Sequence, residues 1–599
     1  MSMDIQFSTM TPFRFFTSRP SRAGKYVRFA YFSILLVCSV GGPAKQTAPP
    51  SPIFYKTQSS DEWVTHTLHV QKLYSRVLVV DASDQPPHQV RIGTLDLNTR
   101  KKDEAAPFRN YPVSKVYKNL QEAADAAQGG DLVAVMPGRY AGFVVEDKPS
   151  AGDGRYIHFK AMGEPGDVVI EEPSRVADWM ILLRATHHII VQGFNIAGSN
   201  SSEKPPNGTR AGIMMDGDFS QTSRQTHHII LVDNFSHHHR KWGFHSRDTH
   251  TVLIENNLFA FSKQEHSGYA SDGSDNYVIR RNVFFGSNAS GLQCNLDSVS
   301  SLHDLAKNRE LKDYPKEQPT REWAEGLVKL ATEKFGENNF PDGKGVNFII
   351  EENVINENGK AGGGSLNLAG LQDSLIQNNL IYGNANHGIA QWDDANPYDA
   401  AYVDPGPSSP EQVKGPNDLP LWGCQRNTIR NNTVLMDNPE RAAMQCRNGS
   451  WGTKTRNNIF INDQSSSIEV FNTSIYNLDS AFDVINKLQY VGVLPALKKL
   501  ARRLPEGPKT ISGITRERAA SEFVRYNNEP WIIVDGKWWR LNPNRPDFRP
   551  TIDSKLFASW GDSKNLPERD LTGQPRKGAS LGALAPAAGV ASGTAAQNP

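Results

Sequence analysis

An asparagine followed by an apolar residue recurs through the middle of the chain, each time at the end of a short apolar run. The runs are HHIILVDNF, TVLIENNLF, NYVIRRNVF, NFIIEENVI, DSLIQNNLI, TIRNNTV and TKTRNNIFI, and their last asparagines are Asn234, Asn257, Asn282, Asn353, Asn379, Asn432 and Asn458. Neighbouring members lie 23 to 26 residues apart unless an insertion intervenes. A repeat of this length predicts a solenoid, in which each unit buries its apolar face against the next.

A second repeat precedes these runs: a glycine followed by residues that alternate in polarity. Its members are Gly212–Asp216, Gly243–Arg247, Gly268–Asp272, Gly291–Asn295, Gly364–Leu368 and Gly388–Trp392, with Ala443–Arg447 lacking the glycine. Alternation with a period of two predicts strands. We expect the first and third residues after each glycine to point into the solenoid and the second and fourth to face solvent.

Composition agrees with an elongated β protein and excludes some partners. The chain has 599 residues, more than one ordinary core supports, and its 48 glycines and 37 prolines suit a turn-rich fold. Its formal net charge of +1 provides no field that would attract nucleic acid. Cys294, Cys424 and Cys446 are too few and too irregularly spaced for a disulfide framework or a zinc motif.

The N-terminus is typical of an exported protein. Basic residues precede an apolar run from Phe29 to Val40, and small residues follow it. The run is too short to span a bilayer comfortably, so we expect no membrane span. The sequence predicts a signal peptide over 1–44 and a secreted, periplasmic or cell-surface location. Whether Cys38 is lipidated stays open.

Taken together, these features resemble the pectate-lyase-like right-handed parallel β-helix superfamily. The resemblance lies in the Gly-Ile-x-x-Asp strand starts, the stacked asparagines, the segment VYKNLQEAADAAQGGDLVAVMPGRY and the terminal LTGQPRKGASLGAL. It implies an all-β solenoid with an N-terminal capping helix and two long loop insertions, acting on a polysaccharide or oligosaccharide. The superfamily includes lyases, hydrolases, epimerases and inert adhesins, so it leaves the activity open.

The repeats, the N-terminal segment and the closing segment together predict how the chain is divided. We predict an N-terminal extension over 45–115, the β-helix over 116–480, C-terminal rungs and a closing segment over 481–585, and a disordered tail over 586–599. The insertions occupy about 297–345 and 393–423, and the first contains a predicted helix, Thr320–Phe335. Both leave a Gly-start strand just after its outward residue, so we expect them to border the same face. Loops of this length usually serve a function.

Polar residues that could carry chemistry gather on that face. In the enzymes that the chain resembles, the active groove runs along the outer side of the Gly-start strands. Here that side presents Asp216, His245, Arg247 and Asp272, all of which we expect to be solvated. Rungs stack about 4.8 Å apart, which places the two carboxylates about 10 Å apart with Arg247 between them. The same ladder is also compatible with simple cross-strand charge pairing.

The first functional hypothesis is a polysaccharide lyase or related uronate-modifying enzyme that acts by β-elimination. Arg247 would neutralise the uronate carboxylate, and His245 or His266 would remove the proton, with Lys241 in reserve. Asp216 and Asp272 would hold Ca²⁺ through their oxygens. The candidate substrate-binding residues are Gln293, Asn295, Trp392 and Arg447.

Two alternatives remain open at this stage. A glycoside hydrolase would use Asp216 and Asp272 as its acid and base, although Arg247 between them would lower both pKa values and spoil the acid. A non-catalytic glycan-binding or surface protein needs neither. The chain is expected to be a monomer without a nucleic acid partner. The glycan, its linkage and any metal requirement are not set by the sequence.

Overall fold

The computed structural model describes residues 60–93, 108–393 and 419–587 together with Tyr398, except positions 205–206, 218, 223, 297–298, 338, 362, 448, 508, 537, 559 and 577–578. The predicted signal peptide, nearly all of the second insertion and the tail from 588 onward lie outside the described residues. Within the described ranges no helix combines the length and apolarity that crossing a bilayer requires.

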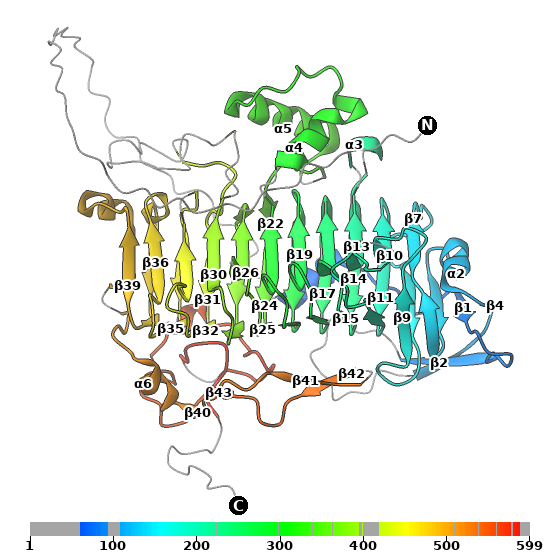
Figure 1. Cartoon of the computed structure of the whole chain (residues 1–599). Coiled ribbons are helices and arrows are strands. Elements are labelled where there is room, and N and C mark those ends of the chain that lie inside the picture. Colours follow the sequence, from blue (N-terminus) through cyan, green and yellow to red (C-terminus); the bar gives the residue numbers. More distant parts are fainter. Residues whose placement is uncertain are drawn as a thin grey trace, which may run out of the picture. The chain divides into compact units, whose positions relative to one another are not determined.

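Three long parallel sheets form the body of the protein, and the chain passes through them in the same order on every turn (Figure 1). Of the described residues, 40% are in strands and 12% in helices. Successive turns pair in register, as where Ile213 lies opposite Phe244. This is the predicted right-handed parallel β-helix.

Sheet 1 collects the Gly-start strands, as predicted. Its strands are β7 (Phe143–Glu146), β10 (Trp179–Arg184), β13 (Ala211–Asp216), β16 (Trp242–Arg247), β19 (Gly268–Ser271), β22 (Leu292–Asn295), β26 (Gly364–Ala369), β30 (His387–Trp392), β33 (Met444–Cys446), β36 (Ile468–Phe471) and β39 (Leu488–Val491).

Sheets 2 and 3 complete each turn. Sheet 2 contains β4 (Lys115–Tyr117), β1 (Arg76–Val80), β5 (Asp131–Val135), β8 (Ile157–Ala161), β11 (His187–Gln192), β14 (Thr226–Val232), β17 (Thr249–Glu255), β20 (Asp275–Arg280), β24 (Phe348–Glu351), β28 (Leu375–Gln377), β31 (Thr428–Arg430), β34 (Lys454–Arg456) and β37 (Asp479–Ala481). Sheet 3 contains β6 (Gly138–Ala141), β9 (Val168–Glu172), β12 (Asn195–Ala197), β15 (Phe235–His237), β18 (Leu258–Ala260), β21 (Val283–Phe285), β25 (Val354–Asn356), β29 (Leu380–Tyr382), β32 (Thr433–Met436), β35 (Ile459–Asn462) and β38 (Val484–Ile485).

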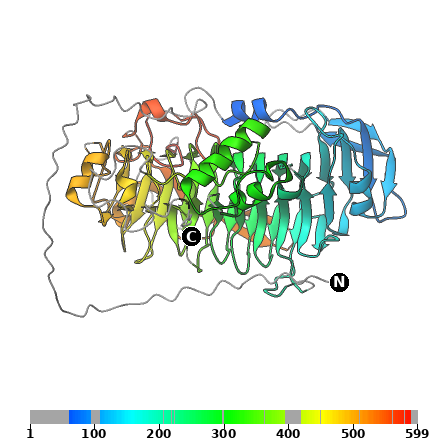
Figure 2. The same ribbon diagram turned by 90° about the horizontal axis from the view of Figure 1, so that it is seen from above.

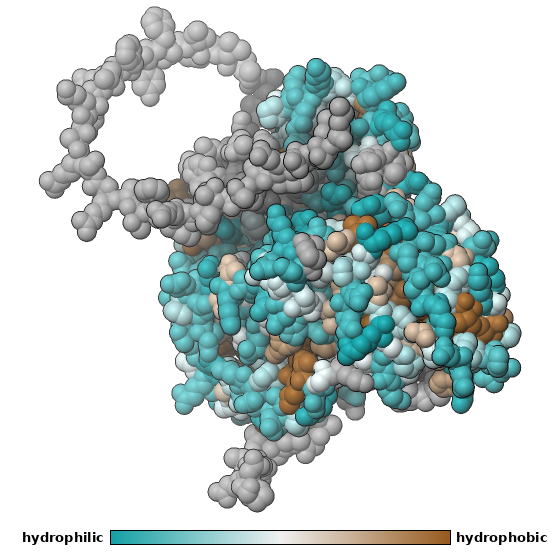
Figure 3. Space-filling model, turned by 45° about the vertical axis from the view of Figure 1, so that its right-hand side comes forward, coloured by the Kyte–Doolittle hydropathy of each residue, from teal (hydrophilic) through white to brown (hydrophobic). Residues whose placement is uncertain are grey.

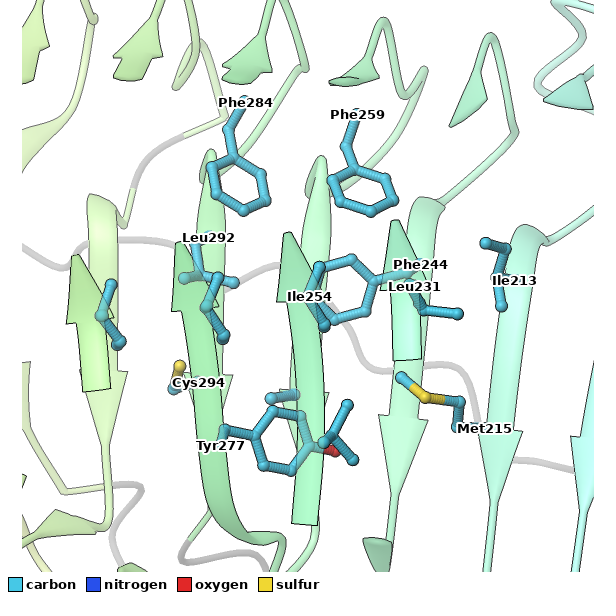
Figure 4. Packing of buried hydrophobic residues seen from close by; sticks show 14 of the residues in the cluster. Ile213, Met215, Leu231, Phe244, Ile254, Phe259, Tyr277, Phe284, Leu292 and Cys294 are labelled. Carbon is cyan, nitrogen blue, oxygen red and sulfur yellow. The ribbon is translucent and has the colours of Figure 1, made fainter. Parts of the chain in front are cut away.

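The interior is a continuous apolar column to which every turn contributes. Figure 4 shows Phe259 and Phe284 stacked on successive turns, with Phe244 and Leu292 pointing into the same space. The ring centroids of Phe259 and Phe284 are 5.7 Å apart. Apolar residues at equivalent inward positions of successive turns stack on one another and leave no gaps. The identity of an inward residue can therefore vary between repeats, whereas its apolar character cannot.

The recurrent asparagines form a buried ladder between sheets 2 and 3. Each Nδ2 donates to the Oδ1 of the next asparagine, for example Asn257 to Asn282 at 3.0 Å and Asn282 to Asn353 at 3.1 Å. Each Oδ1 also accepts a backbone N–H of the preceding turn, and the ladder ends on the carboxylate of Asp483. The predicted stack is therefore confirmed, with all its polar groups bonded.

A short helix lies near the N-terminal end of the solenoid, where the capping helix was expected. Helix α2 (Leu120–Ala126) begins after Asn119, whose side chain accepts the N–H of Glu122. Leu120, Ala123 and Ala124 join the core. Sheet 2 continues past β5 to β1 and β4, so this helix is flanked by strands from the N-terminal extension. The antiparallel pair β2 (Gln89–Gly93) and β3 (Phe108–Pro112) belongs to the same extension. Helix α1 (Ser60–Thr67) packs instead on middle strands of sheet 2, where Val64 joins Ile230 and Leu253.

The register of sheet 1 corrects two of the predicted repeats. In β19, Gly268 itself takes the inward position opposite Phe244 and Leu292, so Tyr269 points outward instead of inward. A Cβ on Gly268 would lie 2.4 Å from Phe244 Cε1, so the large ring requires a glycine there. Asp272 consequently falls beyond the strand, and Ser271 lies opposite Arg247 in its place. The segment starting at Gly364 shifts by one position in the opposite direction, so Leu366 takes the inward position opposite Leu292.

The first insertion rises at the edge where the strands of sheet 1 end. It contains α4 (Val299–Lys307), η2 (Arg309–Leu311) and α5 (Arg321–Phe335), which lie together with α3 (Phe219–Thr222) (Figure 1). Seen from above, α5 lies across the middle turns of the solenoid (Figure 2). The predicted helix is confirmed, with Thr320 as its N-cap. Tyr398 and Trp422 pack against it, so these aromatic rings anchor the insertion. A two-stranded sheet of β23 (Gly345–Val346) and β27 (Leu371–Gln372) follows.

After the last turns the chain doubles back along the outer side of sheet 3. Its elements are α6 (Arg516–Ala520), η8 (Ser563–Asn565), and two antiparallel pairs, β40 (Phe523–Arg525) with β43 (Asp547–Pro550) and β41 (Ile532–Asp535) with β42 (Trp538–Leu541). Two short helices precede this segment: η6 (Thr473–Ile475) between β36 and β37, and η7 (Pro495–Leu500) after β39. Phe523, Ile532 and Phe548 cover apolar residues on the outside of sheet 3. The closing segment packs there too, through Leu581 and Leu584.

Candidate functional site

The outer face of sheet 1 changes character along the solenoid axis. One outward column reads Val144, Leu182, Met214, His245, Tyr269, Gln293, Asn367, Ala390 and Gln445. The neighbouring column reads Glu146, Arg184, Asp216, Arg247, Ser271, Asn295, Ala369 and Trp392. The titratable residues thus concentrate on β10 to β19, next to the first insertion. Figure 3 shows a mainly hydrophilic surface in its view, with hydrophobic residues in small patches.

His245 lies at the centre of this cluster and is held on three sides. Its ring stacks on Tyr269 with centroids 4.9 Å apart and planes 12° apart, and Trp242 lies 4.3 Å away, tilted. Its Nε2 is 3.0 Å from Ser271 Oγ. The side chain is 7% exposed. Its Nδ1 is buried with no hydrogen-bond partner among the described residues.

The bonds of Ser271 determine which nitrogen of His245 carries the proton. Ser271 Oγ is 2.9 Å from Ser246 O and 3.0 Å from Asp272 Oδ2, and both are acceptors. The hydroxyl proton therefore points to one of them, and Ser271 accepts the Nε2–H of His245. The lone pair of the imidazole is then on Nδ1. Burial, and after it the charges of Arg210 and Arg247, hold the pKa of His245 well below its usual range, so the ring is neutral.

Arg210 is the residue that sequence reasoning missed. Its guanidinium carbon lies 4.9 Å from the ring centroid of Trp242 and 5.4 Å from that of Trp179. No salt bridge to it is found within the described part of the chain, and its Nε has no hydrogen-bond partner there. Burial lowers the pKa of Arg210. The available signal was position, because Arg210 stands two residues before Gly212 just as Lys241 stands two before Gly243.

Arg247, by contrast, is already engaged. It donates from Nε and Nη2 to Asp216 Oδ1 at 3.1 and 2.8 Å, and Arg184 Nε lies 3.6 Å from Asp216 Oδ2. Asp216 is only 7% exposed, so the expectation that this carboxylate is solvated was wrong. The side chains of Arg247 and Arg184 lie against this carboxylate. Burial acts to lower the pKa of Arg247, but the carboxylates of Asp216 and Asp248 outweigh it and raise the pKa.

Asp272 belongs to a group of carboxylates beneath helix α4. It accepts from Ser271 Oγ and, at 2.5 Å, from Ser300 Oγ of that helix. Asp248, at the corner after β16, is fully buried, and both its carboxylate oxygens lack a partner among the described residues. Burial and then the charge of Asp272 raise the pKa of Asp248 well above its usual value. Burial also raises the pKa of Asp304 on α4.

The other predicted catalytic residues lie beside His245 but are occupied. Lys241 forms an ion pair with Glu265, and its Nζ lies 5.1 Å from the ring centroid of Trp242. His266 Nδ1 accepts the backbone N–H of Ser290 at 3.1 Å. Burial lowers the pKa of His266 to about 4. Lys241 and the Nδ1 of His266 are therefore engaged, whereas His245 Nδ1 has no partner among the described residues.

The predicted substrate-binding residues are only partly brought together. Trp392 Nε1 donates to Asn367 Oδ1 at 3.0 Å, and Asn367 Nδ2 donates to Gln293 Oε1 at 2.6 Å, so these side chains form a fixed row. Asn295 Nδ2 is 3.4 Å from the Tyr269 hydroxyl. Arg447 follows β33, five strands beyond β16, and is exposed. At about 4.8 Å per strand it lies too far away to touch the same sugar as His245.

A cavity of about 290 Å³ lies away from this cluster. Its lining includes Glu164, Asp233, Asn256, Trp538 and Trp539, contributed by the corner of sheets 2 and 3 and by the C-terminal pair β41–β42. It contains none of the predicted site residues. We place the candidate site at His245 because titratable, unpartnered and stacked groups meet there.

Comparisons with known proteins support the fold alone. No protein-family model and no curated protein matches the chain. Among solved structures it is similar to pectate lyase Pel9A, at 12% identity and a TM-score of 0.42, over 78% of this chain and 90% of that one. It is also similar to an alginate lyase from Paenibacillus sp. str. FPU-7 (14%, 0.35, over 62% and 95%) and to the A-module of the Azotobacter vinelandii mannuronan C-5 epimerase AlgE4 (16%, 0.36, over 65% and 92%). Sequence identities and TM-scores this low carry no information about which reaction, if any, this chain catalyses.

Proposed function

We propose that the protein acts on an acidic, uronate-containing polysaccharide, by β-elimination or a related uronate modification, on the outer face of sheet 1 between β13 and β22. One observation carries the proposal. Within the described residues, a neutral imidazole with an unpartnered lone pair, His245 Nδ1, lies beside a guanidinium that forms no salt bridge, Arg210. A base next to an anion-binding cation is what proton removal alpha to a carboxylate requires.

The roles follow from these positions. Arg210 binds the substrate carboxylate and offsets the negative charge that builds up when the C5–H bond breaks. His245 Nδ1 takes the C5 proton, and the electron pair forms the C4–C5 double bond as the C4–O bond breaks. We assign to Tyr269, half-exposed and stacked on His245, the donation of a proton to the leaving oxygen.

Substrate binding would also strengthen the base. Arg210 is the largest single charge that lowers the pKa of His245, after burial. A substrate carboxylate paired with Arg210 cancels much of that charge, so the pKa of His245 rises when the substrate is bound. The imidazolium formed after proton transfer keeps its Nε2–H on Ser271 Oγ, which lies 3.0 Å from Asp272 Oδ2, so the positive ring faces a carboxylate through one hydroxyl.

A hydrolase based on Asp216 and Asp272 is disfavoured by their surroundings. Asp216 accepts two N–H bonds from Arg247 and lies against Arg184, so its oxygens are already engaged within the folded chain. The second candidate is a non-catalytic glycan-binding protein. The half-exposed Tyr269 and the fixed row of Trp392, Asn367 and Gln293 favour it, because aromatic faces and amides suit sugar rings.

Calcium bound by Asp216 and Asp272 remains a prediction. Asp216 directs its oxygens to Arg247 and Arg184, and Asp272 accepts from two serines, so an ion there would have to displace these donors. Within this cluster, Asp248 has both carboxylate oxygens buried without a hydrogen-bond partner among the described residues. We therefore propose Asp248 as the first ligand if Ca²⁺ binds in this cluster, and we route no step of the reaction through the ion.

The test is a screen of uronate polymers and neutral glycans with the full chain, with and without chelator. A lyase product gains a double bond that absorbs in the near ultraviolet. We expect turnover of one uronate polymer, loss by orders of magnitude in His245→Ala and Arg210→Ala, and no change in Arg540→Ala, an exposed arginine on β42. Binding without turnover would favour the glycan-binding protein. Turnover that survives in His245→Ala would remove the proposed base.

We also propose export, on the basis of the N-terminal sequence. The purified protein should begin after the small residues near position 44. Recovery of the protein from the cytoplasm with an intact N-terminus would contradict it.

A further inference from the structure

Five histidines stack in two neighbouring columns at the start of three sheet 2 strands, β11, β14 and β17. His187, His227 and His250 form one column, with ring centroids 4.9 and 4.8 Å apart and planes within 12°. His188 and His228 form the other, with centroids 4.4 Å apart and planes 14° apart. The columns belong to a different sheet from the proposed groove, so a role for these histidines is independent of the proposed function.

The two columns face each other nitrogen to nitrogen. His227 Nδ1 lies 2.7 Å from His228 Nδ1, and His187 Nδ1 lies 3.0 Å from His188 Nδ1. Two imidazoles hold such a distance when one carries a proton and the other accepts it. A metal ion can take the place of that proton, because it binds the lone pairs of both rings.

We propose that His188, His227 and His228 bind one divalent transition-metal ion, of which Zn²⁺ is the probe. One nitrogen from each of the three rings lies within 4.8 Å of the other two, and the described residues contain no other such group of histidine, cysteine or acidic side chains. Three imidazoles match zinc, nickel or copper, whereas calcium and magnesium take oxygen ligands.

The surroundings suit a metal ligand set. Asp153 Oδ1 lies 3.1 Å from His188 Nε2, so the carboxylate accepts that N–H and leaves the lone pair of His188 on Nδ1. His227 and His228 are half-buried, which leaves a way in for an ion. Burial lowers the pKa of His228 to about 3, so this imidazole is in the neutral form that binds metal.

The chain contains a matched control for a purely structural role. At the corner after β15, His237 Nδ1 and His238 Nδ1 lie 2.6 Å apart in the same facing arrangement. Their neighbour His239 turns instead to Ser236 and Thr209. If the facing rings serve packing alone, substitutions in the two pairs should have the same effect on metal uptake. A metal site requires the third nitrogen, which His188 supplies to only one of the pairs.

The experiment is a calorimetric Zn²⁺ titration of the full chain, purified without a histidine tag and stripped with chelator. We expect about one ion per chain. His227→Gln/His228→Gln should abolish the uptake, and His237→Gln/His238→Gln should leave it unchanged. Asp153→Asn should weaken binding by about 10- to 100-fold. No uptake by the wild-type chain, or equal loss in both double variants, would overturn the proposal.

A second measurement protects against a variant that does not fold. Zinc-edge X-ray absorption of the loaded wild-type chain reports the nitrogen ligands directly, with imidazole scattering from three rings expected. A shell of oxygen ligands without imidazole would overturn the site even if the ion binds.

Discussion

The asparagine ladder and the outer face of sheet 1 are both built by the same repeat, yet they treat polar groups in opposite ways. In the ladder, each turn places the same residue at the same point, and every amide is bonded to the turns on either side. On the outer face the residue type changes at each turn, from Met214 to His245 to Tyr269. There His245 Nδ1, Trp242 Nε1 and Arg210 Nε are buried without partners in the described part of the chain.

The difference separates positions that hold the fold from positions that are available for a ligand. A buried polar group costs free energy unless it is bonded, so the ladder stabilises the solenoid and the outer face does not. Groups that are left unbonded in the folded chain can still bond to a substrate. The comparison therefore predicts large losses of stability in the ladder and small ones on the outer face.

The largest effect is expected in the ladder. Asn353→Ala removes the bonds from Asn353 Nδ2 to Ile279 O and Asn379 Oδ1, and it orphans the backbone N–H of Asn282. At about 1 kcal/mol for each lost bond and about 1–3 kcal/mol for each orphaned group, the free energy of unfolding should fall by about 3–5 kcal/mol. Urea titration measures it. Asn528→Ala, at an exposed site, is the control and should cost less than about 1 kcal/mol. Equal losses in the two variants would contradict the structural role of the ladder.

Arg247→Ala should have an intermediate effect. The variant leaves the Asp216 carboxylate buried, and Arg184, at 3.6 Å, is then the only described cation paired with it. The other carboxylates of the cluster remain nearby. We expect a loss of about 2 kcal/mol, below the full value for a buried pair because Arg247 is partly exposed. A loss under about 0.5 kcal/mol would show that Asp216 is hydrated in solution. The measurement also matters for function, because a destabilised variant cannot distinguish a catalytic Arg247 from a structural one.

The ladder could be predicted from the sequence and most of the site could not. Stacked asparagines recur at a fixed spacing, and that spacing is enough to give the solenoid, the strand faces and the first insertion. The register of β19 depends instead on the size of Phe244 on the neighbouring turn, which no spacing reveals. The repeat shows only that Arg210 precedes a Gly-start strand. That it forms no salt bridge within the described residues becomes visible only in the folded chain, where the turns stack. The burial of Asp216 and its pairing with Arg247 likewise appear only in the folded chain.

Asp248→Asn should change stability by a smaller amount and with the opposite sign. Burial raises the folded-state pKa of Asp248, so between its ordinary value near 4 and that raised value the folded chain holds more protons than the unfolded chain. Stability therefore falls as the pH rises through this window. The asparagine variant avoids that cost and should be more stable than wild type at pH 7 by about 1–2 kcal/mol, with no gain near pH 4.

Thermal unfolding against pH measures this difference, with Asp535→Asn at an exposed site as the control. The same series tests calcium. If Ca²⁺ raises the melting temperature of wild type and not that of Asp248→Asn, Asp248 is a ligand. A variant that is less stable than wild type at pH 7 would show that the carboxylate has partners that make its ionised form favourable.

Arg210→Ala should have the smallest effect on stability and the clearest effect on function. Its guanidinium stacks on Trp179 and Trp242 and forms no salt bridge within the described residues, so the loss amounts to cation–π contacts of about 0.5–1 kcal/mol. If Arg210 binds the substrate carboxylate, the same variant should lose affinity for a uronate oligosaccharide while a neutral oligosaccharide is unaffected. Arg210→Lys should restore part of the affinity, because it keeps the charge but not the paired N–H donors. Calorimetry with both sugars and a melting curve decide the matter together. A stable Arg210→Ala variant that still binds uronate as wild type does would show that this cation serves packing. Unbonded polar groups on the outer face of sheet 1 would then no longer indicate where the ligand binds.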